Sequence, residues 1–504
     1  MLYSLFRTHA QQHPDKAAIV YEGESITYAE MCARIERSAG ALRARGVTPG
    51  AVVATCYGND IDNLVLLFAL ARAGARLVTL DVASTEHELA QIMADCRPSW
   101  IVTEQAHFDK IEAAANATVA DATIVSERTA SIRLADLLTP REDHRDALED
   151  REWSDDFILQ YTSGSTGKPK GVMQSQRGLC NRLRNWMDTA RLNADDSHLC
   201  ILTLSHGYGS HCVALPALCS GGTLHMFDLR RVSPQRVLRY LERHRVTCFY
   251  ALPFFYQLMA QIPKRVSCDL SALRMSMVGS APVAPGTLAQ FYDRFGITLN
   301  NTYGLSEIGI ITSDLRPGPR CPDGTIGALV KGIEARLEPV EDDAGDGDVG
   351  ELVVRSDSMA EGYFAPEDGP MLRDGWLYTK DLVRRDEGGN YYLIGRTSQF
   401  INVAGNKVMP LEIEEVVQEV PGVREVAVVG VGDPLLGQRP AAFVVAEPGV
   451  SAGTIHEHCR DKLAGFKVPD HIYFRASLPK SPAGKILKSK LDPAQGSEQA
   501  SAGD

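Results

Sequence analysis

The sequence predicts an α/β protein, with a large N-terminal domain of mostly parallel sheets flanked by helices and a small α+β domain at the C-terminal end. Three observations predict this fold. Strand-like and helix-like segments alternate over most of the chain, which is typical of parallel sheets. The length of 504 residues exceeds what one compact core accommodates. After about residue 395 the pattern changes to a short, compact mixture of helices and strands.

In the first half of the chain the predicted elements follow one another closely. Thr27 is expected to cap a helix over 28–44, with Glu30 in its first turn. A second helix is expected over 64–73. The segments predicted as strands, each apolar and short, are 17–21, 51–56, 100–103, 157–161 and 247–251.

In the second half, the acidic and glycine-rich run 341–350 predicts a surface turn, followed by a strand over 351–355. The domain boundary is expected at 395–398, and residues 399–491 are long enough for a small α+β domain. The polar stretch 492–504 predicts a disordered tail. The elements expected in the small domain are helices over 411–419, with Pro410 at its start, and 454–463, and strands over 426–431, 441–446 and 471–474.

Composition excludes several classes of protein. With 64 acidic and 52 basic residues the net charge is -12, so nucleic acid is not an expected partner. The 11 cysteines include no CxxC pair and are expected to be free thiols in a reducing compartment. The N-terminus lacks a signal-peptide pattern, and the longest apolar stretch, 64–75, is too short to span a bilayer. A cytoplasmic protein without a membrane span is expected.

The strongest local signal is the glycine-rich segment YTSGSTGKPKG at 161–171, directly after the predicted strand 157–161. Glycines allow backbone N–H groups to approach an anion, hydroxyls add donors and lysines add positive charge, which together suit a polyphosphate. The segment is not a Walker A loop, because Thr162 stands where that motif has glycine and Pro169 follows the lysine. The residues expected to bind phosphate are Thr162, Ser163, Gly164, Ser165, Thr166, Gly167, Lys168 and Lys170.

This segment resembles the signature of the adenylate-forming enzymes, the superfamily of acyl-CoA synthetases, peptide-synthetase adenylation domains and firefly luciferase. The resemblance extends from about residue 14 to residue 491, with further motifs in the expected order. It implies an AMP-binding domain over 1–395, a hinge at 396–398 and a mobile lid domain over 399–491. It also implies ATP and Mg²⁺ as cofactors, with CoA or the phosphopantetheine of a carrier protein as acceptor.

The segment NTYGLSE at 301–307 resembles the second nucleotide motif of these enzymes. The resemblance implies that Tyr303 lies against adenine and Ser306 contacts the α-phosphate. It assigns Mg²⁺ to Glu307 and Thr162, since hard cations prefer oxygen ligands. Asp381 would accept hydrogen bonds from ribose, and Arg396 would contact the nucleotide. The nucleotide-binding residues implied beyond the glycine-rich segment are Asn301, Tyr303, Gly304, Ser306, Asp381 and Arg396.

The resemblance further implies catalytic roles for Lys485, His206 and Glu307. The Lys485 ammonium would lie between the substrate carboxylate and the α-phosphate and stabilise charge as phosphorus becomes pentacoordinate. Tyr208 stands where amino-acid-activating domains have the Asp that binds an α-ammonium, which disfavours a charged amine in the pocket. The acid-pocket residues implied are His206, Tyr208, Gly279, Ser280 and Gly304, with room expected beyond Gly279.

Two positions depart from the family pattern: Lys380 stands where glycine is usual, and Ser398 stands where the hinge commonly has Asp or Lys.

The function expected is that of an AMP-forming acid–thiol ligase acting on an aliphatic or aryl acid, with CoA as acceptor. One alternative is a stand-alone adenylation enzyme that loads a separate carrier protein. Another is a non-catalytic sensor of nucleotide or acyl ligand, which the two departures would fit. The sequence does not identify the acid.

Overall fold

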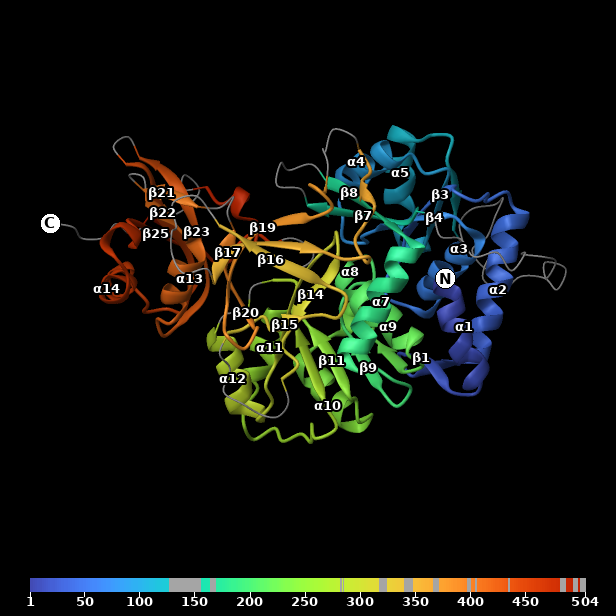
Figure 1. The fold of residues 1–504 in the computed structure, drawn as a ribbon, viewed down its shortest axis with the longest axis horizontal. Helices are drawn as coiled ribbons and strands as arrows, with labels where there is room; N and C mark the ends of the chain where they lie inside the picture. The colour runs from blue at the N-terminus through green and yellow to red at the C-terminus, as the bar shows by residue number, and fades with distance from the viewer. Residues whose placement is uncertain are drawn as a thin grey trace.

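The computed structural model shows a large N-terminal part and a smaller C-terminal part, which lies at the left of Figure 1. Two mixed sheets with helices on their faces make up most of the larger part, and an antiparallel sheet lies between it and the smaller part. The residues that the structure describes are 1–126, 156–163, 169–281, 283, 285–316, 324–339, 348–365, 371–396, 400–403, 406–433, 436–480, 486–492 and 497–498.

The largest sheet has nine strands in the order β15-β14-β13-β12-β11-β9-β10-β1-β2. Its middle, from β13 to β1, is parallel, while β14, β15 and β2 add antiparallel edges. Most residues of the parallel strands are buried, because helices cover them. Their bounds are β15 (Ala328–Leu329), β14 (Gly309–Ser313), β13 (Asn300–Leu305), β12 (Met275–Val278), β11 (Cys248–Ala251), β9 (Ser197–Cys200), β10 (Thr223–Met226), β1 (Ala17–Tyr21) and β2 (Glu24–Thr27).

The second sheet has seven strands in the order β18-β8-β7-β4-β3-β5-β6. The run from β7 to β6 is parallel, and β8 returns antiparallel beside β7. The bounds are β18 (Gly362–Tyr363), β8 (Pro169–Ser175), β7 (Asp156–Ser163), β4 (Arg76–Leu80), β3 (Val52–Cys56), β5 (Trp100–Thr103) and β6 (Thr123–Val125).

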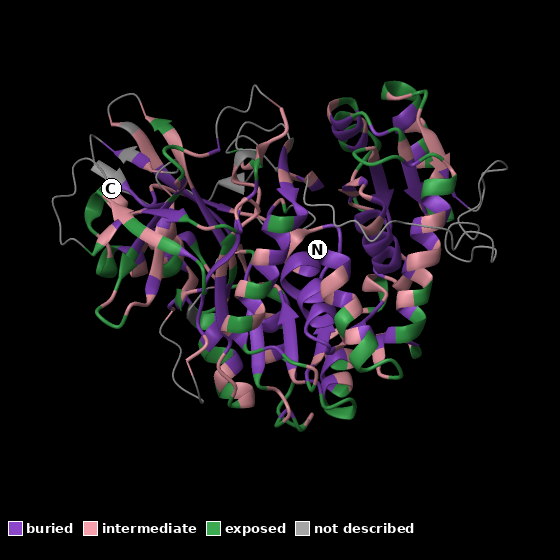
Figure 2. Cartoon of the chain, turned by 45° about the vertical axis from the view of Figure 1, so that its right-hand side comes forward, coloured by how far each residue is buried: buried purple, intermediate pink, exposed green. Residues whose placement is uncertain are grey.

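Helices bury the faces of these two sheets, and Figure 2 shows the centre of the larger part as mostly buried. Helix α3 is apolar on every side and buried along most of its length, as expected of a core helix. The bounds are α1 (Leu2–Gln12), α2 (Tyr28–Ala44), α3 (Ile61–Ala73), α4 (Glu86–Cys96), η1 (Gln105–His107), α5 (Phe108–Thr118), α7 (Gln176–Ala190), α8 (Gly207–Gly209), the π-helix η3 (Ser210–Ala214), α9 (Leu215–Cys219), η4 (Leu229–Arg231), α10 (Pro234–Arg243), α11 (Pro253–Ala260) and α12 (Pro285–Phe295).

A four-stranded antiparallel sheet connects the two parts of the chain. The strand order follows the sequence, and the last strand ends at Arg396, the first residue of the expected hinge. Its strands are β16 (Glu334–Glu338), β17 (Val349–Arg355), β19 (Leu377–Arg385) and β20 (Tyr391–Arg396).

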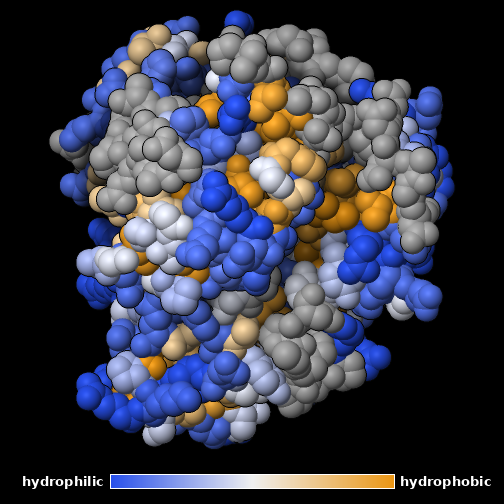
Figure 3. All heavy atoms as spheres, turned by 90° about the vertical axis from the view of Figure 1, so that its left-hand side faces the viewer, coloured by the Kyte–Doolittle hydropathy of each residue, from blue (hydrophilic) through white to orange (hydrophobic). Residues whose placement is uncertain are grey.

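The C-terminal part has its own sheet and its own apolar core, built by residues such as Ile413, Val428 and Ile455. The strands run in the order β22-β21-β24-β25-β26, and β23 also pairs with β24. The face of the molecule drawn in Figure 3 carries mainly hydrophilic residues, with smaller hydrophobic areas between them. The elements are β21 (Ile401–Val403), β22 (Asn406–Val408), α13 (Pro410–Gln418), β23 (Val423–Asp433), β24 (Gly437–Ala446), α14 (Ala452–Lys462), η7 (Gly465–Lys467), β25 (His471–Phe474), η8 (Lys488–Lys490) and β26 (Ser497–Glu498).

The predicted α/β fold is confirmed, and so are its predicted elements within a few residues of their expected ends. Thr27 and Glu30 form the capping box of α2. Most of the predicted turn 341–350 lies outside the described residues. Inside the predicted tail, Ser497–Glu498 instead pairs with β25, whose edge offers unpaired backbone groups. Across the described residues, no helix combines the length and apolar character that a membrane crossing requires.

Candidate active site

Three of the predicted nucleotide-binding residues meet where β13 approaches the antiparallel sheet. The Tyr303 hydroxyl, on β13, donates a hydrogen bond of 2.6 Å to Oδ2 of Asp381 on β19. Nε of Arg396, at the end of β20, lies 2.8 Å from the other carboxylate oxygen. Asp381 is only 4% exposed, so these partners fix its orientation. Burial, together with the neighbouring Asp381 carboxylate, raises the pKa of Tyr303, which keeps its hydroxyl a donor.

The backbone conformation at Lys380 shows why glycine is usual at this position. Lys380 has φ of +60°, in the left-handed region that glycine adopts without steric cost. Its N–H donates to Glu351 Oε1 at 2.9 Å, and the next N–H, of Asp381, donates to Thr379 Oγ1 at 3.1 Å. This turn of the backbone inside β19 aims Asp381 at Tyr303. A lysine therefore occupies a conformation that the family usually gives to glycine.

The remaining residues of the 301–307 motif have mostly internal partners. The buried Asn301 amide donates to the carbonyl oxygen of Thr325 at 3.0 Å. Gly304 allows β13 and β14 to approach, because a Cβ there would lie 2.2 Å from the carbonyl oxygen of Gly309. The carbonyl oxygen of Ser306 accepts a hydrogen bond of 3.3 Å from Arg182. These contacts position the motif.

Glu307 lies beside Lys170, the described lysine of the glycine-rich segment. The Tyr363 hydroxyl donates to Glu307 Oε1 at 3.1 Å, and Lys170 Nζ lies 5.0 Å above the Tyr363 ring. Tyr363 is held there because β18 pairs with β8, which carries Lys170. Among the described residues, Glu307 Oε2 has no hydrogen-bond or ion-pair partner. One carboxylate with a spare oxygen fits Mg²⁺, which takes one or two protein carboxylates plus phosphate oxygens.

The described ends of the glycine-rich segment lie in the paired strands β7 and β8. Thr162 pairs with Lys170 and Ser163 with Pro169, so strand pairing continues up to residues 163 and 169. A strand, β8, begins at Pro169 inside the segment, and no helix opens on the lysine before it. Gly164, Ser165, Thr166, Gly167 and Lys168 lie outside the described residues, and only the backbone of Thr162 and Ser163 is described.

The His206 imidazole lies against a carboxylate that the sequence reasoning missed. His206 Nε2 is 3.1 Å from Oδ2 of Asp81, which directly follows β4. Ser205 Oγ donates to the same oxygen at 2.9 Å, and the Ala83 N–H donates to Oδ1 at 2.7 Å. Burial alone would raise the pKa of Asp81, but these partners outweigh it and the pKa is lowered. The sequence signal that could have identified Asp81 is its position at the carboxyl end of a parallel strand, where α/β folds bind ligands.

A cavity of about 500 Å³ opens beside His206. Its walls are mainly apolar, and two of its side chains, Phe254 and Leu258, are exposed by 46% and 43%. Lys480 of the C-terminal part also lines it, so the two parts of the chain meet there. Of the predicted pocket residues it contains His206, Tyr208 and Ser280. Its lining residues are Ile201, Leu202, Thr203, His206, Tyr208, Gly209, Leu229, Val232, Pro234, Leu252, Phe254, Phe255, Leu258, Ser280 and Lys480.

The room expected beyond Gly279 is filled. A Cβ at Gly279 would lie 2.6 Å from Thr302 Cγ2 and 3.6 Å from the Tyr208 ring. Gly279 therefore permits close packing and does not deepen the cavity, and Gly304 is not among the lining residues either. The Tyr208 hydroxyl has no hydrogen-bond partner among the described residues, although the ring lines the cavity. Burial raises the pKa of Tyr208, so this hydroxyl stays protonated and can donate a hydrogen bond.

Lys485 and Ser398 fall in segments outside the described residues. The flanking residues Lys480 and Ile486 pair antiparallel, so the segment that carries Lys485 begins and ends close together. Lys480 Nζ forms an ion pair of 2.8 Å with Glu425 of β23. These contacts attach the base of the segment to the C-terminal part, near the cavity that Lys480 lines.

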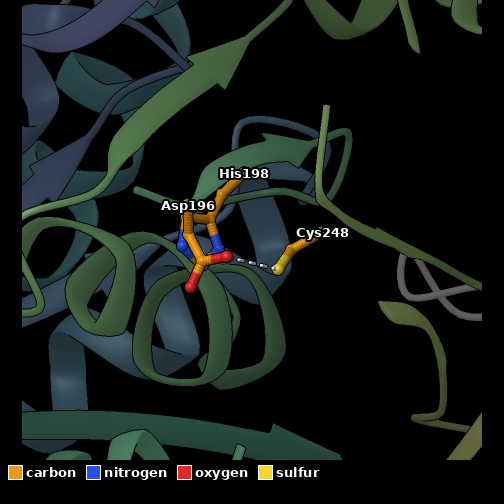
Figure 4. Close-up of side chains that lie close together, drawn as sticks. All are labelled: Asp196, His198 and Cys248. Atoms are coloured by element: carbon orange, nitrogen blue, oxygen red, sulfur yellow. Dashed lines mark hydrogen bonds between the residues drawn. The ribbon is translucent and has the colours of Figure 1, made fainter. Parts of the chain in front are cut away.

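One further cluster has the chemistry of metal ligands. Asp196, His198 and Cys248 lie with their donor atoms within 4.8 Å of one another (Figure 4). Asp196 already accepts hydrogen bonds from Thr247 and from Arg274, which reaches its two oxygens at 2.7 and 2.6 Å. Burial raises the pKa of Cys248 to about 12, so its thiol stays protonated. The carboxylate and the thiol of this cluster therefore already have partners within the core, while His198 Nε2 has no hydrogen-bond partner among the described residues. The ten described cysteines are free, as expected.

The comparisons with known proteins agree with this geometry. Residues 6–364 match the family model described as AMP-binding enzyme, and residues 412–485 match the AMP-binding enzyme C-terminal domain. The chain therefore belongs to the AMP-binding enzyme family. It is 32% identical over 495 residues to a feruloyl-CoA synthase of Amycolatopsis sp and 32% identical over 496 residues to an indoleacetate–CoA ligase of Aromatoleum aromaticum, covering 96% of each chain.

A solved structure of ATP-bound MatB from Rhodopseudomonas palustris superposes with a TM-score of 0.87 at 29% identity, covering 97% of this chain and 98% of that one. These findings confirm the predicted superfamily, its fold and the predicted class of enzyme, an AMP-forming acid–thiol ligase. The individual site residues, the domain boundaries, the absence of a nucleic-acid partner and the cytoplasmic location stay predictions.

Proposed function

We propose that this protein activates a bulky, mainly apolar carboxylic acid with ATP and transfers the acyl group to CoA. The observation that carries the choice of acid is the cavity of about 500 Å³ with its apolar walls. Its lining residues include no carboxylate, so an α-ammonium would be buried there without a counter-ion. The feruloyl-CoA synthase and indoleacetate–CoA ligase are named for aryl acids, which supports the same class here.

The Tyr208 hydroxyl adds a second element of specificity. It is a buried donor without a partner among the described residues, on a wall that is otherwise mainly apolar. A ring substituent that accepts a hydrogen bond would satisfy it, whereas an unsubstituted ring would leave it unpaired. The preferred substrate is therefore an aryl acid that carries an oxygen substituent.

In the first half-reaction the acid attacks the α-phosphate of ATP and releases pyrophosphate. Tyr303, Asp381 and Arg396 hold the nucleoside, and the glycine-rich segment with Lys168 and Lys170 holds the phosphates. Mg²⁺ held by Glu307, together with Thr162, would neutralise part of the phosphate charge. The Lys485 ammonium stabilises the charge that develops between the carboxylate and the α-phosphate.

In the second half-reaction a thiol attacks the acyl carbonyl, and AMP leaves. Lys485 has to move away before the thiol enters, so the C-terminal domain, 399–491, turns about a hinge at 396–398. The separate apolar core of this domain supports such a movement, because the domain keeps its packing when it turns. The unusual Ser398 is compatible with a hinge, since backbone rotation needs no fixed side chain.

An acid panel tests this function. Purified protein with ATP and Mg²⁺ is given oxygen-substituted aryl acids, unsubstituted aryl acids, short dicarboxylic acids and α-amino acids, each with CoA or with a phosphopantetheinylated carrier protein. Pyrophosphate release and the mass of the acylated product are measured. We expect the fastest release with oxygen-substituted aryl acids and acyl-CoA as product. Preference for α-amino acids, or acylated carrier protein without acyl-CoA, would contradict the proposal.

The matched variant Tyr208→Phe removes the hydroxyl and keeps the ring. We expect it to lower kcat/KM for oxygen-substituted aryl acids by about tenfold, since a donor to the substrate is lost. The unsubstituted aryl acid should lose little, because it makes no bond with that hydroxyl. An equal loss for both acids would contradict the assigned role.

A further inference from the structure

A second, much smaller cavity lies behind the 301–307 motif and apart from the acid cavity. It is enclosed by α7 (Figure 1), by the π-helix η3 and by apolar side chains of the β13–β14 region. The space left for the centre of a water-sized sphere is about 10 Å³, which admits one small particle. Its lining residues are Arg182, Asn185, Trp186, His211, Cys212, Ile308, Ile310, Val330, Ile333 and Ser358.

Four of the lining residues carry a buried nitrogen atom that lacks a hydrogen-bond partner among the described residues: Arg182 Nε, Asn185 Nδ2, Trp186 Nε1 and His211 Nδ1. The side chains of Arg182, Trp186 and His211 are all more than nine-tenths buried. The nitrogens of Arg182, Asn185 and Trp186 only donate, and that of neutral His211 can donate as well. Burial lowers the pKa of His211 to about 3, so the ring is neutral at physiological pH.

The charge of Arg182 is also uncompensated at contact distance. Its guanidinium donates to Gln174 Oε1 at 2.5 Å and to the carbonyl oxygens of Ser306 and Ser358 at 3.3 and 3.4 Å. These acceptors are neutral, and no described carboxylate lies within ion-pair distance of it, although the negative charge of Glu307 acts on the guanidinium from farther away. Burial lowers the pKa of Arg182 only to about 10, so it is charged at neutral pH. A buried charge is costly unless an opposite charge accompanies it.

The surrounding fold makes room for this arginine. Gly309 has φ of +88°, and a Cβ there would lie 2.6 Å from Arg182 Cδ. Any residue other than glycine at position 309 would therefore collide with the Arg182 side chain. A water molecule in the cavity would accept at most two of the four hydrogen bonds and would bring two donors of its own.

We propose that this cavity is a binding site for one monatomic anion, with chloride as the physiological occupant. The anion accepts hydrogen bonds from Arg182, Asn185, Trp186 and His211 and balances the guanidinium charge. The volume of about 10 Å³ is the space for the centre of a water-sized sphere, so the cavity itself is larger than this volume. An ion somewhat larger than water still fits. The ion holds the Arg182 side chain in place, and Arg182 donates a hydrogen bond to the carbonyl oxygen of Ser306. The ion thereby stabilises the motif that ends in Glu307.

Halide titration of the complete protein tests the site without depending on catalysis. The melting temperature is followed as chloride or bromide replaces gluconate at constant ionic strength. We expect a saturable rise with both halides. The variant Trp186→Phe, which removes one donor and keeps an aromatic ring, should weaken the apparent halide affinity about tenfold. The control Trp376→Phe, at a tryptophan that stacks under Arg336 and Arg355 elsewhere in the fold, should leave the affinity unchanged.

Crystals grown with bromide provide an independent readout. We expect an anomalous scattering peak inside the cavity, within contact of Arg182 Nε and Trp186 Nε1. A water-like peak without anomalous signal, or a halide effect that Trp186→Phe does not alter, would overturn the proposal. Neither result would bear on the acid ligase activity, which the acid panel tests separately.

Discussion

Asp381 and Arg396 stand directly opposite each other on the antiparallel strands β19 and β20 and form an ion pair of 2.8 Å. The same carboxylate accepts the Tyr303 hydroxyl, so residues from three strands meet at one group. Residue 396 is also the first residue of the expected hinge. In the proposed mechanism this ion pair would link movement of the C-terminal domain to the position of the carboxylate proposed to bind the nucleotide.

The first prediction concerns ATP binding. Asp381→Asn keeps the size of the side chain and removes its charge, so ATP affinity measured by calorimetry should fall by about tenfold to a hundredfold, as expected for losing a charge-assisted hydrogen bond to ribose. Asp386→Asn, at a half-buried carboxylate in the turn between the same two strands, is the control and should bind ATP normally. Unchanged ATP affinity in Asp381→Asn would rule out the assigned role. The preference among acids should not change.

The second prediction separates the two half-reactions. Lys485→Ala should slow adenylate formation by about a hundredfold to a thousandfold, the usual effect of removing one electrostatic stabiliser of a transition state. Reaction of supplied acyl adenylate with CoA should change far less, because Lys485 has left the site by then. Lys490→Ala, at an exposed lysine nearby, is the control. Equal losses in both half-reactions would contradict the role of Lys485.

The third prediction concerns the backbone at Lys380. Because its φ of +60° suits glycine, Lys380→Gly should raise the free energy of unfolding by about 0.5–1 kcal/mol, measured by urea denaturation. Lys380→Ala keeps the unfavourable conformation and serves as the control for loss of the side chain. A destabilised Lys380→Gly variant would show that the lysine side chain contributes more than its backbone conformation costs.

The fourth prediction concerns pH. The pKa of Asp81 is below its ordinary value of 3.8 because hydrogen bonds to its carboxylate outweigh the effect of burial. The stability from this ionisation is therefore present above about pH 4 and is lost as the pH falls through the lowered pKa. Asp81→Asn should cost about 1–2 kcal/mol of unfolding free energy at pH 7, and that difference should shrink at pH 3. A difference that stays constant between pH 7 and pH 3 would contradict this account.

Local signals predicted the secondary structure and the order of the motifs. The capping box of Thr27 and Glu30 identifies the start of α2 because both side chains act within one helical turn. The apolar strand 100–103 is found without error because its pattern is short and continuous. Pro169 correctly argued against a helix opening on the lysine before it, but the strand β8 that pairs with β7 was not predicted.

Relationships between distant residues could not be predicted in this way. Asp81 and His206 are brought together by the order of strands and by the loops that follow them, neither of which a local pattern encodes. Likewise, the small size of Gly279 suggested space that Thr302 and the Tyr208 ring in fact fill. The donors around the small cavity come from two helices, and only packing shows that they face one space.

The central claim is that an otherwise unreactive carboxylate becomes an acyl adenylate. Tracing ¹⁸O tests it most directly. An oxygen-substituted aryl acid labelled in both carboxylate oxygens is converted with ATP and CoA. The masses of the products are then measured by mass spectrometry. Attack of the acid on the α-phosphate predicts one ¹⁸O in AMP and one in the acyl-CoA. Label in pyrophosphate or phosphate, or AMP without label, would contradict the account.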